Sequence, residues 1–216
     1  MSAAAVPRIE ALVSDFGGVL TTPLIEAFGA LRERSGIDLA DVGRAMARVA
    51  ERSGAHPLFE LETGRLSLAD FLSSLAGALR EETGRDVALD GFEDAYFAEL
   101  HPNEELIEFF RTLRSERGLR LALLTNNVRE WEPLWRAKLP VDELFEVVVD
   151  SAFVGMRKPD PEIYELTLAR LGLPAPACLF LDDLDVNVEA ARALGMPAIH
   201  FRTTPQAIAE ISAALP

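Results

Sequence analysis

The feature that most constrains the fold is the regular alternation of short apolar segments and amphipathic segments after residue 100. The apolar segments are rich in Val, Ile and Leu and are typical of buried strands. Strands are predicted over residues 119–126, 145–150, 178–183 and 197–201, and helices over residues 102–118, 160–172, 186–195 and 205–215, with one more around Trp131 and Trp135. Strands that alternate with helices form a parallel sheet covered on both faces. The pattern therefore predicts an α/β fold.

One further strand is separated from the rest of this pattern. Residues 9–14 form an apolar run that ends in a Gly-Gly turn, whereas residues 22–100 have only helical patterning. Helices are predicted over residues 23–36, 38–54, 67–84 and 91–100, with Asp38 and Ser67 as N-caps. The sequence thus predicts an α/β core of residues 1–20 and 101–216. A helical cap, residues 21–100, is inserted after the first strand and joins the core near the carboxyl edge of the sheet.

Charge and composition narrow the class of partner. The chain has 35 Asp and Glu residues and 21 Lys and Arg residues, which gives a formal net charge of −14. This balance disfavours nucleic-acid binding and docking on an anionic membrane, both of which depend on basic side chains. Cys178 is the one cysteine, so the chain forms no internal disulfide, and neither a secretory signal nor a membrane-spanning segment is evident. We expect a cytoplasmic protein, either a monomer or a homodimer.

Polar side chains occur where the predicted strands end. They are Asp15 after the first strand, Thr125 and Asn126 after the second, Asp182 and Asp183 after a later one, and Lys158 in the intervening loop. In an open parallel sheet, ligands bind beyond the carboxyl ends of the strands, so these groups are expected to converge on one cleft. Asp15 and Asp183 offer the oxygen ligands that Mg²⁺ prefers, while Thr125 and Lys158 suit the oxygens of a phosphate. A Mg²⁺ site that takes a small phosphorylated metabolite is therefore predicted.

Four motifs in order, "DFGGVL", "LLTNN", "GMRKPDPEIY" and "LFLDDLDVNVEAARALGM", resemble those of the haloacid dehalogenase-like superfamily. The resemblance is to its phosphatases with a helical cap, in particular sugar-1-phosphatases and the N-terminal domains of soluble epoxide hydrolases. It covers almost the whole chain. It implies a Rossmann-like core, a mobile cap, and Mg²⁺-dependent hydrolysis of a phosphate ester through a covalent aspartyl-phosphate.

The same resemblance implies a role for each matched residue. Asp15 would be the nucleophile, Thr125 would hold the phosphoryl group, and Lys158 would pair with both nucleophile and phosphate. Asn126 would join Thr125 and Lys158 in binding the substrate. The Mg²⁺ ion would be bound by Asp15, Asp183 and the backbone carbonyl of Gly17. Asp182 is expected to support the loop after the later strand through hydrogen bonds, and Asn187 to lie behind the metal ligands or to cap a helix.

Gly17 departs from the family pattern, in which an aspartate two residues after the nucleophile acts as general acid and base. Such a group contributes roughly 10²–10⁴ in rate. Three alternatives follow: a phosphatase whose leaving group needs little protonation, a dehalogenase that releases halide, or a protein that binds a phosphorylated ligand or a partner without turnover. The Asp182–Asp183 pair counts against the dehalogenase. A cap residue that faces the cleft is another source of the acid, and the candidates are His56, Glu60, Glu62 and Arg65.

Overall fold

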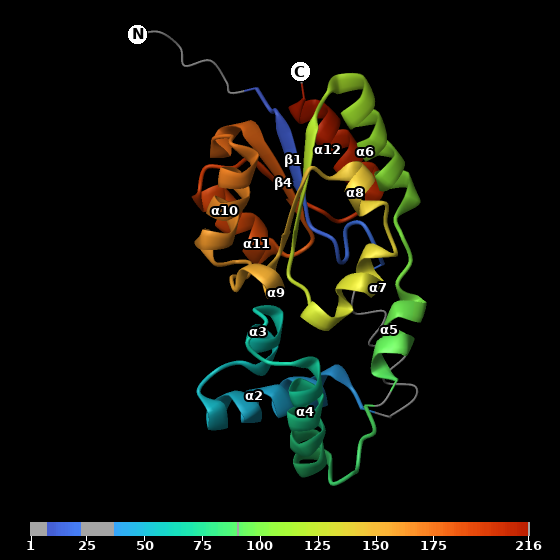
Figure 1. Ribbon diagram of the computed structural model, residues 1–216, viewed down its shortest axis with the longest axis vertical. Coiled ribbons are helices and arrows are strands. Elements are labelled where there is room, and N and C mark those ends of the chain that lie inside the picture. The colour runs from blue at the N-terminus through green and yellow to red at the C-terminus, as the bar shows by residue number, and fades with distance from the viewer. Residues whose placement is uncertain (1–7, 23–36, 90, 216) are drawn as a thin grey trace.

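The computed structural model describes residues 8–22, 37–89 and 91–215 of the chain and contains one sheet of five parallel strands. The strand order is β3-β2-β1-β4-β5 (Figure 1). The strands are β1 (Ala11–Ser14), β2 (Arg120–Thr125), β3 (Val147–Asp150), β4 (Cys178–Asp182) and β5 (Ala198–His200). The predicted α/β fold and parallel sheet are confirmed, and the strand ends differ from the expected ones by one or two residues.

The side chains of the sheet alternate between two apolar layers. Leu12 of β1 packs in one layer and Val13 in the other, as expected for successive residues of a strand. Helices α6 (Glu104–Arg117) and α12 (Thr204–Ala214) cover the first face, and α10 (Pro161–Leu171) and α11 (Asp185–Ala193) cover the second (Figure 1). With β1 in the centre and both faces covered, Asp15 at the end of β1 lies at the middle of the sheet's carboxyl edge.

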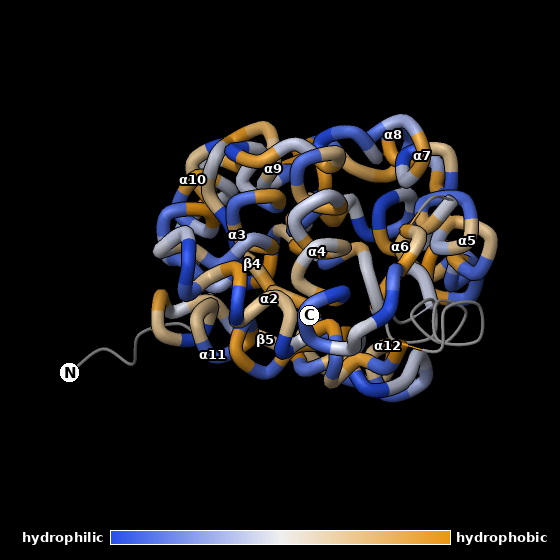
Figure 2. Tube along the Cα trace, turned by 90° about the horizontal axis from the view of Figure 1, so that it is seen from below, coloured by the Kyte–Doolittle hydropathy of each residue, from blue (hydrophilic) through white to orange (hydrophobic). Residues whose placement is uncertain are grey.

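A helical insert, described here over residues 37–89 and 91–100, follows β1 and precedes α6. Its helices are α2 (Leu39–Ser53), α3 (Pro57–Glu62), α4 (Leu68–Thr83) and α5 (Phe92–Glu99). The predicted caps are confirmed, because the side chains of Asp38 and Ser67 accept hydrogen bonds from the third residue of α2 and α4. Figure 2 views the molecule from the end at which the insert lies. In this view the chain trace of α2 and of α4 alternates between hydrophilic and hydrophobic residues. The helix predicted over residues 23–36 lies outside the described residues.

Helix α3 was not predicted, because its segment was expected to be irregular. Pro57 occupies the first turn, where its fixed φ angle and missing N–H suit a helix start. The helix is six residues long, too short to display a helical period in the sequence. In the structure α3 is the part of the insert that lies nearest to α9 (Ser151–Val154) at the end of β3 (Figure 1).

The two connections between insert and sheet run side by side. Thr21 forms an antiparallel bridge with Pro102, the amide of Asn103 donates to the carbonyl of Leu20 at 2.8 Å, and that of Thr22 donates to His101 at 2.9 Å. The insert thus leaves and rejoins the α/β layer at one place, beyond the end of β1. This geometry agrees with the predicted domain boundaries near residues 20 and 101, which remain a prediction.

Short elements complete the fold. The helix expected around Trp131 and Trp135 is split into a 3₁₀ turn, η1 (Arg129–Trp131), and α7 (Glu132–Arg136), followed by α8 (Val141–Leu144) and, later, η2 (Ala175–Ala177). Pro133 occupies the start of α7. Across the described parts of the chain, no helix has both the length and the apolar composition required to cross a lipid bilayer.

Candidate functional site

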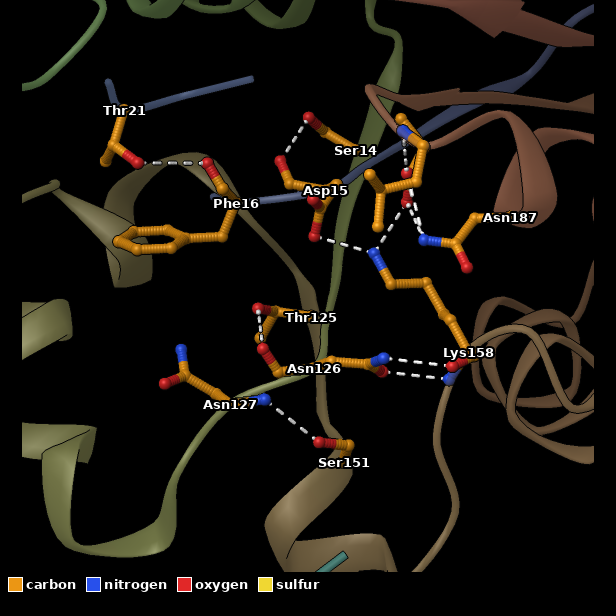
Figure 3. Close-up of polar contacts among 12 residues, drawn as sticks. Ser14, Asp15, Phe16, Thr21, Thr125, Asn126, Asn127, Ser151, Lys158 and Asn187 are labelled. Atoms are coloured by element: carbon orange, nitrogen blue, oxygen red, sulfur yellow. Dashed lines mark hydrogen bonds and ion pairs between the residues drawn. The ribbon is translucent and has the colours of Figure 1, made fainter. Parts of the chain in front are cut away.

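Three adjacent strands deliver polar side chains to the same edge of the sheet. Asp15 follows β1, Thr125 ends β2 and Asp182 ends β4, and β1 lies between β2 and β4. Ser14 is in register with Leu123 of β2 and Leu181 of β4, so Asp15 and Asp182 lie at one level and Thr125 lies one residue further along β2. Figure 3 shows the side chains of Asp15 and Lys158 pointing toward each other, with Thr125 beside them. The structure therefore brings together the side chains that the sequence placed in one cleft.

Lys158 is the centre of this arrangement. Its Nζ lies 2.6 Å from Oδ1 of Asp15 and 2.7 Å from Oδ2 of Asp182, and its side chain is 2% exposed (Figure 3). A buried ammonium needs charged partners, since burial alone disfavours the charged form. Although burial lowers the pKa of Lys158, the two carboxylates outweigh that effect and raise it. The two carboxylates therefore favour the charged form of the lysine, which links the ends of β1 and β4.

Asp15 experiences opposing effects. Burial raises its pKa, Lys158 lowers it, and the neighbouring carboxylates of Asp182 and Asp183 raise it again, with a result of about 7. Burial and Asp182 likewise raise the pKa of Asp183. If all three carboxylates are ionised, Lys158 balances one of their three negative charges and leaves two. A site with this excess of buried negative charge is suited to a divalent cation.

The carboxylate oxygens of Asp15, Asp182 and Asp183 also have a suitable spacing for a cation, since one from each lies within 4.8 Å of the others. All are hard oxygen donors, the type that Mg²⁺ prefers. The oxygens of Asp182 are already engaged: they accept hydrogen bonds from the amide of Leu184 at 2.9 Å and from Nδ2 of Asn187 at 3.0 and 3.1 Å, besides the bond from Lys158. Asp182 thus supports its loop through hydrogen bonds, and Asn187 lies behind the site and holds the Asp182 carboxylate, which leaves Asp15 and Asp183 as the better placed metal ligands.

The Gly-Gly turn after β1 is explained by its second glycine. Gly18 has a φ angle of +79°, and a Cβ atom built on it would lie 2.8 Å from Cγ of Asp183 and closer still to Oδ2. Only glycine combines this backbone conformation with so close an approach. The turn at residues 17–18 is therefore packed directly against the Asp183 carboxylate. That the carbonyl of Gly17 contributes to the metal site remains a prediction.

Thr125 and Asn126 have different environments. Thr125 is 1% exposed, and its Oγ1 donates a long hydrogen bond of 3.4 Å to the carbonyl of Asn126. The amide group of Asn126 pairs with the backbone of Lys158: Nδ2 donates to the carbonyl at 2.9 Å, and Oδ1 accepts from the amide at 2.8 Å (Figure 3). The side chain of Asn126 thus holds the lysine loop, which leaves its backbone for the predicted contact with a substrate.

Of the four candidates from the insert, two contact the α/β layer. Nε of Arg157 donates to Oε2 of Glu62 at 2.8 Å, and Arg65 reaches the carbonyl of Gly155 at 3.5 Å. Glu60 forms an ion pair with Arg65 at 2.8 Å, within the insert. His56 stacks on the ring of Phe59 with 4.3 Å between the centroids.

Sequence reasoning did not place Asp182 against the lysine, nor His200 beside the acidic loop. Nε2 of His200 lies 2.9 Å from the carbonyl of Asp183, and its Nδ1 lies 3.6 Å from Oδ1 of Asp185. The position of His200 at the end of β5, next to β4, is the signal that would have indicated this contact. For Asp182, the available signal was its place as the last residue of a central strand.

Comparison with known proteins gives a consistent result. The family model described as haloacid dehalogenase-like hydrolase matches residues 5–195. Phosphatase MT3486 of Mycobacterium tuberculosis (strain CDC 1551) is 33% identical over 195 residues, which cover 88% of this chain and 86% of that protein. The phosphorylated carbohydrates phosphatase of Thermotoga maritima is 32% identical over 198 residues, which cover 89% and 84%.

A solved structure shows the same fold. The HAD family enzyme bt-2542 of Bacteroides thetaiotaomicron, crystallised with magnesium and inorganic phosphate, superposes with a TM-score of 0.64 at 22% sequence identity. The match covers 91% of this chain and 96% of that one. The sheet with its helical insert, the motifs at the strand ends and the family match agree, and the chain belongs to the haloacid dehalogenase-like hydrolases.

Proposed function

We propose that this protein is a Mg²⁺-dependent phosphatase that acts on a small phosphorylated metabolite. The observation that carries the proposal is the convergence of the Asp15, Asp182 and Asp183 carboxylates near the buried ammonium of Lys158, which balances only part of their charge. The two relatives described above from Mycobacterium tuberculosis and Thermotoga maritima are both named phosphatases, which supports it.

In the proposed reaction, an oxygen of Asp15 attacks phosphorus and the bond from phosphorus to the ester oxygen breaks. The product is a covalent aspartyl-phosphate and a free leaving group. Water then attacks the same phosphorus, the bond to Asp15 breaks, and inorganic phosphate leaves. Splitting the hydrolysis in this way replaces one difficult step by two easier ones.

The other residues act by position and charge, which account for most of the catalysis of phosphoryl transfer. Lys158 lowers the pKa of Asp15, which favours the ionised nucleophile, and neutralises charge on the phosphoryl oxygens. Thr125 and the backbone amide that follows it hold those oxygens. Asp15, Asp183 and the carbonyl of Gly17 would hold Mg²⁺, which supplies further neutralisation of the phosphoryl charge when bound. Asp182 orients Lys158 and the loop that carries Asp183.

Gly17 limits the substrates for which this scheme is efficient. Without a carboxyl at that position, the departing oxygen receives its proton from solvent or leaves as an anion. Leaving groups of low pKa are therefore favoured, such as the anomeric oxygen of a sugar 1-phosphate or the carboxylate of an acyl phosphate. The phosphorylated-carbohydrate relative is consistent with the first of these classes.

The test is phosphate release by the purified protein across a panel of sugar 1-phosphates, sugar 6-phosphates and acyl phosphates, with Mg²⁺ and with EDTA. The Asp15→Asn variant, which keeps the shape and removes the nucleophile, is the control. We expect turnover that requires both Mg²⁺ and Asp15. Turnover that persists in EDTA, or in Asp15→Asn, refutes the mechanism.

The glycine at position 17 also favours a second candidate, a protein that binds a phosphorylated ligand without turning it over. This candidate predicts no phosphate release from any ester of the panel. It also predicts that at least one ester raises the melting temperature in the presence of Mg²⁺, since a ligand that binds only the folded state stabilises it. A dehalogenase, in contrast, would release halide from a 2-haloacid in EDTA.

A further inference from the structure

Glu62 at the end of α3 contacts the α/β layer with both its side chain and its backbone. Its Oε2 accepts from Nε of Arg157 at 2.8 Å, and its carbonyl accepts from Oγ of Ser151 at 2.5 Å. The side chain of Glu62 is 16% exposed and that of Arg157 is 15% exposed, so this pair is largely shielded from water. Shielded charge pairs of this kind are strongly sensitive to the loss of one partner.

Each of these contacts leads to a segment of the candidate site. Arg157 directly precedes Lys158 in the chain. Ser151 accepts a hydrogen bond of 3.0 Å from the amide of Asn127, two residues after Thr125 (Figure 3). One residue of the insert is therefore connected to the lysine loop through its carboxylate and to the Thr125 loop through its carbonyl.

The two segments are also joined to each other. The amide group of Asn126 makes two hydrogen bonds with the backbone of Lys158, one to its carbonyl and one from its amide. Glu62, the 125–127 loop and the 157–158 segment thus form a closed set of contacts. Burial raises the pKa of the Glu62 carboxyl, while the positive charges of Arg157 and Lys158 lower it, so Glu62 is within electrostatic reach of the site lysine.

The insert approaches the α/β layer closely at the same place. Gly64, two residues after Glu62, has a φ angle of +67°, and a Cβ atom there would collide with the carbonyl of Ala152 and lie 2.8 Å from the Arg129 guanidinium. Arg129 itself donates to the carbonyl of Ala152. The segment from α3 to Gly64 is therefore seated against α9 and η1 without intervening side chains at Gly64.

We propose that Glu62 is a positioning residue through which the helical insert holds Thr125 and Lys158 in the geometry that binds a phosphoryl group. This inference deepens the proposed function and rests on it. Glu62 does not supply the missing acid in this account, because its carboxylate is bound to Arg157. Its effect is exerted through Arg157 and Ser151, so that the two segments are ordered only when α3 is seated on them.

The first test measures the two segments themselves and requires no catalysis. Amide hydrogen exchange of the full-length protein, without substrate, is compared between wild type, Glu62→Ala and Glu62→Gln. The matched control is Glu82→Gln, which removes the charge of a carboxylate that is also 16% exposed and also paired with arginine, at 2.6 Å, but within the insert. The informative amides are those of Asn127 and Lys158, both hydrogen-bonded in the contacts above.

We expect Glu62→Ala to increase exchange at Asn127 and Lys158 severalfold. Glu62→Gln, which still accepts a hydrogen bond from Arg157, should have a smaller effect, and Glu82→Gln none. Exchange within α2 and α4 should not change in the Glu62 variants. Unchanged exchange at both amides in Glu62→Ala overturns the inference, and so does an equal increase throughout the insert, which would indicate a general structural role. If Glu62→Ala does not fold, Glu62→Gln decides by the same criteria.

The second test uses the best substrate of the phosphatase panel. Because misplacement of binding groups by about 1 Å can cost about 10²-fold in rate, we expect kcat of Glu62→Ala to fall at least tenfold. A rise in KM at unchanged kcat contradicts the positioning role. If wild type turns over no substrate, the proposed function fails while the exchange test still decides whether Glu62 orders the two segments.

Discussion

Replacing Lys158 with Met leaves Asp15 and Asp182 facing each other in a buried site without the ammonium that separates them. At 2.6 and 2.7 Å and an effective dielectric constant of about 20, the Coulomb attraction of each lost pair is about 6 kcal/mol. The cost of desolvating the ammonium offsets much of this sum. Measured losses for one partner of a buried pair are about 3–5 kcal/mol, and we expect a destabilisation of that size at pH 8.

The loss should depend on pH. Lys158 lowers the pKa of Asp15, so its removal raises that pKa above the wild-type value of about 7. The folded variant then binds more protons than the unfolded chain from about pH 4 to beyond pH 7, and its stability falls as pH rises through this range. At pH 5 Asp15 is protonated in wild type as well, so the two proteins differ in proton binding only above about pH 7, and the loss should be about 1 kcal/mol larger at pH 8 than at pH 5.

The assay is urea unfolding in EDTA at pH 5 and pH 8, with the denaturant slope checked for equality. Lys138→Met is the control: Lys138 donates to the carbonyl of Phe97 and lies outside the carboxylate site. It should cost about 1 kcal/mol at both pH values. A loss in Lys158→Met that is below about 1 kcal/mol, or equal at the two pH values, would refute the electrostatic account of the site.

Three further predictions follow from single residues. Gly18→Ala should weaken Mg²⁺ binding at least tenfold, measured by calorimetry, because the added Cβ displaces Asp183. Gly84 is the control, since it has a similar φ angle of +69° and open space around it. Gly84→Ala should cost about 1 kcal/mol of stability and leave the Mg²⁺ affinity unchanged. Burial raises the pKa of Asp150 to about 6, so ionisation of this carboxyl disfavours the folded state. The stability of the wild type should therefore decline by about 3 kcal/mol between pH 4 and pH 7, and Asp150→Asn should remove this decline. Equal pH profiles of stability in wild type and variant would contradict this. Gly17→Asp should increase kcat/KM by about 10² or more for phosphate esters of alcohols that are poor leaving groups, and should change it little for acyl phosphates. An equal effect on both substrate classes would show that protonation of the leaving group is not limiting.

The strands and most helices were predictable because each carries a local signal. The apolar runs that end at Asp15, Thr125 and Asp182 are short and flanked by turn residues, and α2 and α4 begin at polar caps and end at glycines. Helix α3 and the four-residue α9 show no helical period, since neither completes two helical turns, although α9 also begins at a polar cap and ends at a glycine. Their formation depends on contacts with distant segments rather than on local periodicity.

The members of the site were predictable from chain order, and the pairing of Lys158 with Asp15 from the family resemblance, but the other contacts were not. The rule that parallel strands present their carboxyl ends at one edge brings Asp15 and Asp182 together, without indicating that Lys158 is buried between them. The contact of Glu62 with Arg157 joins residues 95 positions apart and could not be inferred from spacing. The use of the Asn126 amide to hold Lys158 also depends on loop geometry that the sequence does not express.

The most direct test of the central claim is to trap the covalent intermediate. The protein is mixed with Mg²⁺ and its best substrate, quenched in acid during turnover, digested, and analysed by mass spectrometry. The account predicts a phosphoryl group on the peptide that contains Asp15 in the wild-type protein, and none in Asp15→Asn. Steady turnover with no phosphoryl group on that peptide, or with a phosphoryl group on a different residue, would contradict it.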